Sequence, residues 1–168
     1  TPILDTDGNK ITQLIQVNEV LRDSLPEPYF VEQSENQRVI YVGDENIFLN
    51  PGQYTYTLNY QTNNQIRLSD NIYELYFNAI GYDLSVPIDE IKVHVKFPDG
   101  AIIIKQTAET GTFGANNNNY KIKLQSDGDD SNAILFKNIN PFDEQEGLTF
   151  YVAWTEGIMS SIFKSKPE

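Results

Sequence analysis

The residues that could carry out chemistry are few. His94 is the only histidine and the chain has no cysteine, so thiol nucleophiles, cysteine metal sites and multi-histidine zinc sites are excluded. His94 alternates with Val93 and Val95 and lies between two lysines. Because Val93 and Val95 point inward, His94 points to the solvated face, and we interpret it as a surface strand residue. The sequence contains no GxSxG, HExxH or GxxxxGK motif. We therefore predict no enzyme, no catalytic residue and no cofactor.

Acidic side chains are clustered, and two kinds of site could use them. Asp89 with Glu90, or the acidic stretch at 143–146, could supply the two carboxyls of a glycosidase, which lie about 5 to 10 Å apart across a cleft. The stretches DTDGN at 5–9 and DGDD at 127–130 offer the hard oxygen ligands that calcium prefers. Neither has the spacing of a helical calcium loop, and solvated turns explain all of these stretches. We predict no metal site and keep calcium only within an alternative function.

The charge of the chain restricts its partners. It has 24 acidic and 12 basic side chains, a formal charge of -12 at pH 7. Such a charge repels nucleic-acid phosphates and anionic lipid headgroups. We therefore expect no nucleic-acid partner. No apolar run reaches the roughly 18 residues that cross a bilayer, so any membrane attachment is expected through segments outside this sequence.

Alternation of apolar and polar residues with a period of two dominates the chain. It is clearest in QYTYTLNYQ, YELYFNAIG, IDEIKVHVKF, YKIKLQ and LTFYVAW, at 53–61, 73–81, 88–97, 120–125 and 148–154. Weaker strand patterns occupy 10–17, 28–33, 38–42, 101–106 and 133–139. Turn-forming dipeptides separate these segments. The pattern predicts an all-β, antiparallel β-sandwich of about nine or ten strands, immunoglobulin-like or related, with little helix.

The length of 168 residues suits one domain with a core of its own. We expect a single β-sandwich domain over residues 1–164, and residues 165–168 as the start of a linker toward a missing membrane anchor. The stretch GTFGANNNN at 111–119 is interpreted as a long mobile loop, because glycine and asparagine favour turns over ladders.

Tyrosines are frequent, and one row of them could form either a core or a binding platform. Tyr54, Tyr56 and Tyr60 share a predicted strand face with Leu58. Exposed tyrosines can stack on sugars or line protein interfaces. Because the row includes a leucine, we favour a packed core with the hydroxyls at its rim.

One face of the strand at 73–81 is the candidate binding site. If this segment is a strand, Glu74, Tyr76 and Asn78 point to one side, and Leu75 and Phe77 point to the other. The three polar side chains could form a patch that recognises a partner. The structural alternative, which is the more common one, is that Glu74 and Asn78 make hydrogen bonds that fix the strand register.

Several motifs in fixed order resemble a known bacterial family. They lie in VGDENIFLNPGQYTYTLNYQ at 42–61, in YELYFNAIG, and in VPIDEIKVHVKFPDG at 86–100. The chain resembles the N-terminal domain of a family of predicted membrane proteins of unknown function. The matching residues are Gly43, Asp44, Gly52, Tyr54, Tyr56, Tyr60, Glu74, Leu75, Tyr76, Asn78, Gly81, Pro87, Ile88, Pro98 and Gly100. The chain departs from the family where Phe77 replaces a tryptophan and where asparagines fill 116–119.

The resemblance implies a location rather than a reaction. Such proteins carry a secretion signal, a β-rich domain outside the cytoplasm, and then transmembrane helices. We expect a non-enzymatic extracytoplasmic domain of a bacterial membrane-anchored protein, which binds a protein or senses a ligand at the cell envelope. The alternative is a carbohydrate-binding or adhesion module whose acidic loops could bind calcium. The partner is thus expected to be a protein or a glycan of the envelope, and no ligand identity follows from the sequence.

Overall fold

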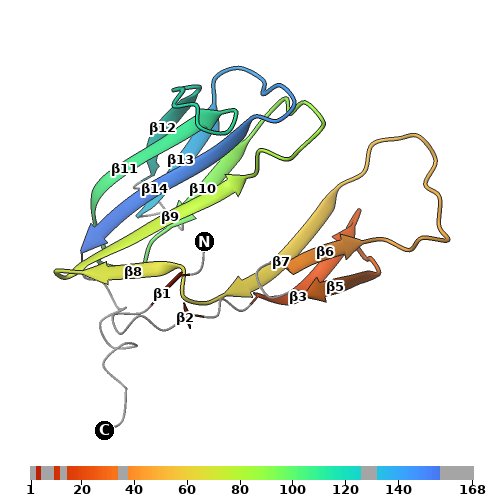
Figure 1. Cartoon of the computed structure of the whole chain (residues 1–168), viewed down its shortest axis with the longest axis horizontal. Coiled ribbons are helices and arrows are strands. Elements are labelled where there is room, and N and C mark those ends of the chain that lie inside the picture. Colours follow the sequence, from red (N-terminus) through yellow and green to blue (C-terminus); the bar gives the residue numbers. More distant parts are fainter. Residues whose placement is uncertain (1–2, 5–9, 12–14, 34–37, 126–131, 156–168) are drawn as a thin grey trace, which may run out of the picture. The chain divides into compact units, whose positions relative to one another are not determined.

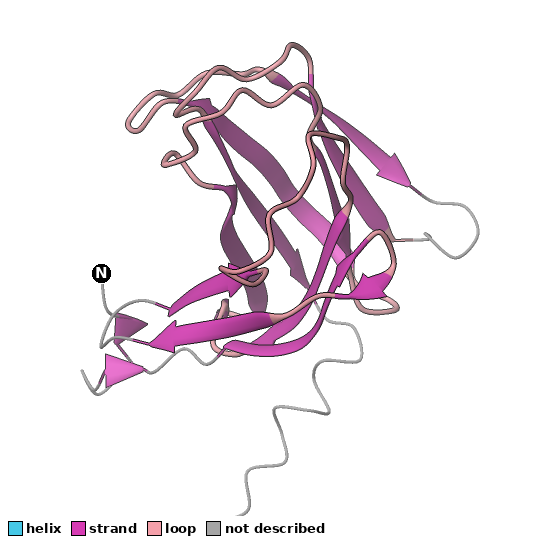
Figure 2. Cartoon of the chain, turned by 90° about the vertical axis from the view of Figure 1, so that its right-hand side faces the viewer, coloured by secondary structure: helices cyan, strands magenta, loops and turns pink. Residues whose placement is uncertain are grey.

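A computed structural model describes residues 3–4, 10–11, 15–33, 38–125 and 132–155 (Figure 1). The chain divides into two compact units, Thr1–Gln65 and Ile66–Glu168. The described residues form strands and loops without a helix (Figure 2), and every strand pair is antiparallel. The predicted all-β, antiparallel class is therefore confirmed. The single domain over residues 1–164 and the immunoglobulin-like topology stay predictions.

The N-terminal unit is built from short sheets. Its strands are β1 (Ile3–Leu4), β2 (Lys10–Ile11), β3 (Ile15–Arg22), β4 (Leu25–Pro26), β5 (Tyr29–Gln33), β6 (Arg38–Val42) and β7 (Tyr56–Thr62). They pair as β1-β2, as β4-β3-β7 and as the hairpin β5-β6. Arg38 of β6 donates from Nη1 to the carbonyl of Ile15 at 3.1 Å, which links the hairpin to β3.

The tight turn between β3 and β4 explains part of this arrangement. Asp23 and Ser24 have φ angles of 50° and 68°, the left-handed backbone that two-residue hairpins require and that aspartate tolerates well. The Asp23 carboxylate also accepts the N–H of Thr55 at 2.9 Å, while the Asp23 N–H donates to the Thr55 carbonyl at 2.8 Å. One residue therefore makes the turn and holds the segment that leads into β7.

The C-terminal unit contains two larger sheets. Its strands are β8 (Ile66–Ser69), β9 (Ile72–Ile80), β10 (Lys92–Lys96), β11 (Ile102–Gly111), β12 (Tyr120–Gln125), β13 (Ala133–Asn138) and β14 (Gly147–Thr155). One sheet has the order β11-β14-β9-β8 and the other β10-β13-β12. In β14, one face consists of Leu148, Phe150, Val152 and Trp154, all buried, as the alternation predicted.

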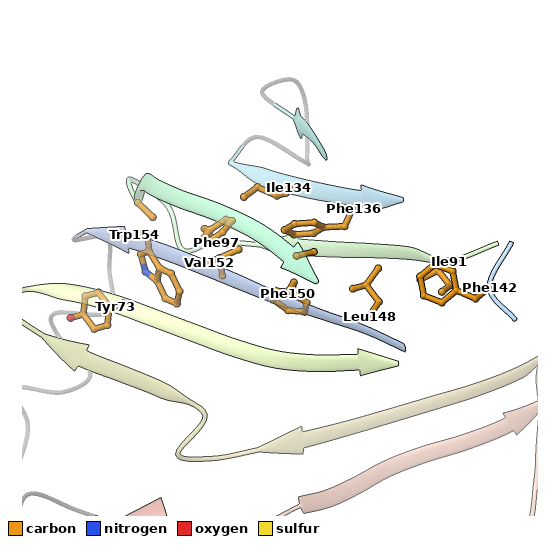
Figure 3. Close-up of a cluster of buried hydrophobic side chains, with 12 residues drawn as sticks. Tyr73, Ile91, Phe97, Ile134, Phe136, Phe142, Leu148, Phe150, Val152 and Trp154 are labelled. Carbon is orange, nitrogen blue, oxygen red and sulfur yellow. The ribbon is translucent and has the colours of Figure 1, made fainter. Parts of the chain in front are cut away.

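The core of this unit lies between its two sheets, in a sandwich-like arrangement (Figure 3). Phe136 of β13 stacks on Phe150 of β14 with ring centroids 5.5 Å apart. Phe97 meets Trp154 edge-on at 5.3 Å, and Trp154 lies against Tyr73 of β9 at 5.7 Å. Aromatic pairs at such distances add stabilisation beyond the burial of their area.

The tyrosine row of β7 corrects one expectation. Tyr56, Leu58 and Tyr60 are exposed, and only Tyr54, which precedes the strand, is half-buried. The core assignment of this row was therefore wrong. Alternation shows which side chains share a face, but it does not show whether a second layer covers that face. β7 is also an edge strand of its three-stranded sheet.

The asparagine-rich loop is tied down at several points. The side-chain hydroxyl of Thr110 donates to the carbonyl of Asn117 at 3.0 Å and accepts the N–H of Asn119 at 2.9 Å. The side chain of Asn119 in turn accepts the N–H of Asn140 at 2.9 Å. These bonds hold the predicted loop against the end of β11 and the turn after β13.

Candidate functional site

The predicted binding face on β9 has the orientation that alternation requires. Tyr76 is 63% exposed, Asn78 is exposed and Glu74 is half-buried. On the other side, Leu75 and Phe77 pack against the core cluster. The structure thus places the three predicted residues on one face of one strand, and that face looks away from the core.

The central strand β14 supplies a partner for Glu74 that the sequence did not reveal. Tyr151 lies opposite Tyr76 in the ladder, and its hydroxyl donates to Glu74 Oε1 at 2.5 Å. The Nζ of Lys105, on β11, lies 5.2 Å from the centre of the Tyr151 ring. The hydrogen bond to Glu74 raises the pKa of Tyr151, and desolvation and the charge of Glu74 raise that pKa further. Tyr151 therefore stays protonated and acts as a donor.

Tyr76 is also kept neutral by its surroundings. Desolvation raises its pKa, and the negative charge of Glu109 and the proximity of Tyr82 add to the effect. The hydroxyls of Tyr82 and Thr149 are 3.2 Å apart, and the Tyr82 ring meets Phe113 edge-on at 6.0 Å. A neutral, exposed phenol can donate a hydrogen bond and stack, but it is no acid or base near pH 7.

The alternative that the polar residues of this face fix the strand register through hydrogen bonds is supported for only one of them. Glu74 is hydrogen-bonded across the sheet, whereas Asn78 makes no side-chain hydrogen bond to any residue that the structure describes. A register-fixing role is therefore supported for Glu74 and not for Asn78. Recognition of a partner by Glu74, Tyr76 and Asn78 together stays a prediction.

We expect Asn78→Ala to leave folding stability nearly unchanged, with the free energy of unfolding within about 0.5 kcal/mol of wild type. The side chain is exposed and holds no described partner. Urea unfolding followed by the fluorescence of Trp154, the only tryptophan, measures the difference. A loss above about 1 kcal/mol would restore the structural explanation for Asn78.

The candidate glycosidase carboxylate Glu90 has the wrong acidity for an acid catalyst. Its carboxylate forms ion pairs with Lys137 and with Lys92. The hydrogen bond from Lys137 lowers the pKa of Glu90, the bond from Lys92 lowers it further, and the result is about 2. A glycosidase acid needs a raised pKa, so this carboxyl fits a surface ion pair instead.

The same ion pairs predict a pH dependence in acid. Because the pKa of Glu90 is lower in the folded chain, its stabilising effect is present above the ordinary pKa of roughly 4.3 and is lost between that value and about 2. NMR titration of the Glu90 side chain should give a pKa of about 2. In Lys137→Ala this pKa should move upward, whereas Lys123→Ala, a lysine outside both ion pairs, should leave it unchanged. An identical pKa in Lys137→Ala would contradict the assignment.

The structure does not test the calcium alternative, because it does not describe the acidic stretches that would bind the ion. Both predicted stretches, 5–9 and 127–130, lie outside the residues that the structure describes. Within the described ranges, no three His, Cys, Asp or Glu side chains are grouped to hold a metal ion.

A hollow in the N-terminal unit was missed by the sequence analysis. It measures about 410 Å³ and lies among β3, β5, β6, β7 and the turn after β6. Its lining consists of Arg22, Glu27, Phe30, Tyr41, Val42, Gly43, Asp44, Glu45, Ile47, Leu49 and Tyr56. The lining residues are spread over 35 positions of the sequence and follow no repeating pattern. The Gly43-Asp44 turn is the only feature of the sequence that points to them.

Comparison with known proteins places the chain in a family. A family model described as "Predicted membrane protein (DUF2207) N-terminal domain" matches residues 3–154. Comparison with curated proteins and with solved structures gives no match. Within the described part of the chain, no helix has the length and hydrophobicity to cross a membrane.

Proposed function

Because the chain belongs to the family of N-terminal domains of DUF2207 predicted membrane proteins, we propose that it is a non-enzymatic, extracytoplasmic module that binds a protein at the bacterial cell envelope. The binding surface is the outer face of β9, with Glu74, Tyr76 and Asn78.

The observation that supports this proposal is the exposure of Tyr76 on a rigid strand. Tyr76 is 63% exposed, while the neighbouring Glu74 accepts a hydrogen bond from Tyr151. Tyrosines are enriched among the residues that dominate protein interfaces, because a large ring with two side-chain torsions loses little entropy on binding. A fixed carboxylate and a free amide beside such a ring add directional hydrogen bonds.

The pKa values of three groups in this unit argue against their use as acid-base catalysts. The pKa values of Tyr76 and Tyr151 are raised above the ordinary tyrosine value, and that of Glu90 is lowered to about 2. These shifts move the three groups away from neutrality, whereas acid-base catalysts are tuned toward it.

Crosslinking in the full-length membrane protein tests the proposal. A photoreactive phenylalanine analogue at position 76 should capture a defined protein in intact cells, and the same analogue at Lys123, an exposed residue of β12, should not. Asn78→Ala should weaken capture from position 76. Equal capture from both positions, or none from position 76, would contradict the proposal.

The sidedness can be tested separately, since the sequence has no cysteine. In the full-length protein, with any thiols elsewhere removed, Lys123→Cys should react with a membrane-impermeant maleimide on intact cells or spheroplasts. Labelling only after lysis would place this domain in the cytoplasm.

Carbohydrate binding is the second candidate, and Tyr76 is the ring that favours it. The only tryptophan, Trp154, is buried in the core, so it offers no platform for a sugar. A cell-wall glycan at about 100 times its dissociation constant should stabilise the chain by about 2.7 kcal/mol in thermal unfolding. Tyr76→Ala should abolish this stabilisation. Glycans that give no shift would remove the candidate.

A further inference from the structure

The hollow of the N-terminal unit has an apolar wall that is uncovered. Phe30 of β5 and Tyr41 of β6 stack in parallel, with ring centroids 4.6 Å apart, and both rings are exposed. Ile47, in the turn after β6, is 55% exposed and lies in the same lining. Monomeric proteins rarely leave contiguous apolar side chains around a concavity in water unless a ligand or partner covers them.

The floor of the hollow contains a buried carboxylate. The Glu27 side chain is only 7% exposed, and its Oε2 pairs with Arg22 at 3.2 Å. Its Oε1 has no hydrogen-bond donor among the described residues and lies beside Gly43, 3.8 Å from where a side chain there would begin. Among the described residues only Trp154 Nε1 is a fully buried side-chain atom without a hydrogen-bond partner, so Glu27 Oε1 keeps some contact with solvent. This oxygen can accept a hydrogen bond from a donor on a bound ligand.

The charge around the hollow favours a positively charged ligand. The lining holds three carboxylates, Glu27, Asp44 and Glu45, against the single guanidinium of Arg22. Over residues 1–65 the sequence has nine acidic and three basic side chains, a net charge of -6. This field attracts cations and repels anionic lipid and a second copy of this acidic chain.

We propose that this hollow binds a basic peptide segment of a partner protein, with one aliphatic or aromatic side chain inserted against Phe30, Tyr41 and Ile47. Lysine or arginine side chains flanking that anchor approach Glu45 and the free oxygen of Glu27. The inference concerns a different unit and different residues from the face of β9, so either can hold without the other.

Selection from a phage library of random twelve-residue peptides on the whole 168-residue chain tests the proposal. The selected peptides should combine lysine or arginine with one large apolar residue. A synthetic copy with its basic residues changed to glutamate, and another with its apolar residue changed to serine, should each bind at least about tenfold more weakly. Binding should also weaken as salt is added.

Neighbouring residues provide a matched pair of variants. Ile47→Ala removes a lining side chain, and Phe48→Ala removes one that is 91% exposed but outside the lining. We expect Ile47→Ala and Glu45→Lys to weaken binding about tenfold or more, and Phe48→Ala and Tyr76→Ala to leave it unchanged. Circular dichroism must show that each variant is folded.

Four results would overturn the inference. Selected peptides without a basic bias would remove the electrostatic argument. An equal loss in Phe48→Ala would indicate general apolar adhesion, and binding of anionic vesicles instead of peptides would indicate a lipid ligand. A library that yields no binding peptide would also count against the proposal.

Discussion

Replacing Phe136 by alanine is expected to lower the free energy of unfolding of the C-terminal unit by about 3 to 5 kcal/mol. Phe136 is 0% exposed, stacks on Phe150 at 5.5 Å and contacts Tyr120 with centroids 6.4 Å apart. Removing the ring deletes its stacking contact with Phe150 and leaves a cavity in a close-packed core. Since small domains are stable by only about 5 to 15 kcal/mol, this is a large share.

The fluorescence of Trp154 allows this loss of stability to be measured in the C-terminal unit. It is the only tryptophan and lies in the same core, so urea unfolding followed by its fluorescence reports on the C-terminal unit. Phe113→Ala is the matched control, because that ring is 88% exposed, and we expect a change within about 0.5 kcal/mol. A cost below about 1 kcal/mol for Phe136→Ala would mean that the two sheets do not pack through this ring.

The strands that the sequence predicted best are those with one face in this core. In β14 the buried face of Leu148, Phe150, Val152 and Trp154 follows directly from alternation. Thr149 and Ala153, on the opposite face, are also buried. Their burial follows from the central position of β14 between β11 and β9, and from the contact of Tyr82 with Thr149. Alternation does not predict the burial of Thr149 or Ala153, because the strands beside β14 are distant from it in sequence.

The N-terminal unit shows the opposite case. Tyr56, Leu58 and Tyr60 alternate as clearly as the residues of β14, yet they are exposed. Among residues 15–33 and 38–65, Val20 is the only buried apolar residue. A sequence pattern specifies a face, whereas burial depends on what other segments provide to cover it.

The two candidate sites also differ in how far the sequence could predict them. Glu74, Tyr76 and Asn78 are two residues apart, so a strand assignment suffices to place them together. The partner of Glu74, Tyr151, lies 77 positions later. The hollow draws its lining from four strands and a turn, so only the folded chain brings those residues together.

Replacing Asn138 by aspartate is expected to destabilise the C-terminal unit by about 3 to 5 kcal/mol at pH 7. The buried Asn138 side chain accepts the N–H of Ile91 at 2.8 Å and donates to the carbonyls of Asp89 at 3.1 Å and Asn140 at 2.9 Å. It joins the end of β13 to the segment before β10. A carboxylate has the same shape but no donor, so it would face two carbonyl oxygens and bury a charge.

The destabilisation should depend on pH in a defined direction. Burial and the facing carbonyls favour the protonated form, so the pKa of the introduced carboxyl is higher in the folded chain than the ordinary value of roughly 3.9. The difference in stability between Asn138→Asp and wild type should therefore be smallest near pH 4 and should grow as the pH rises through the folded-state pKa.

A matched substitution separates the effect of the buried, hydrogen-bonded site from that of the chemical change itself. Asn78→Asp makes the same chemical change at an exposed position without a described side-chain hydrogen bond, and we expect a change within about 0.5 kcal/mol at every pH. If Asn138→Asp and Asn78→Asp had equal effects, the Asn138 bonds would contribute no stability. A large loss for Asn138→Asp alone, shrinking toward pH 4, would show that the buried amide of Asn138 holds the segment before the edge strand β10 to the end of β13.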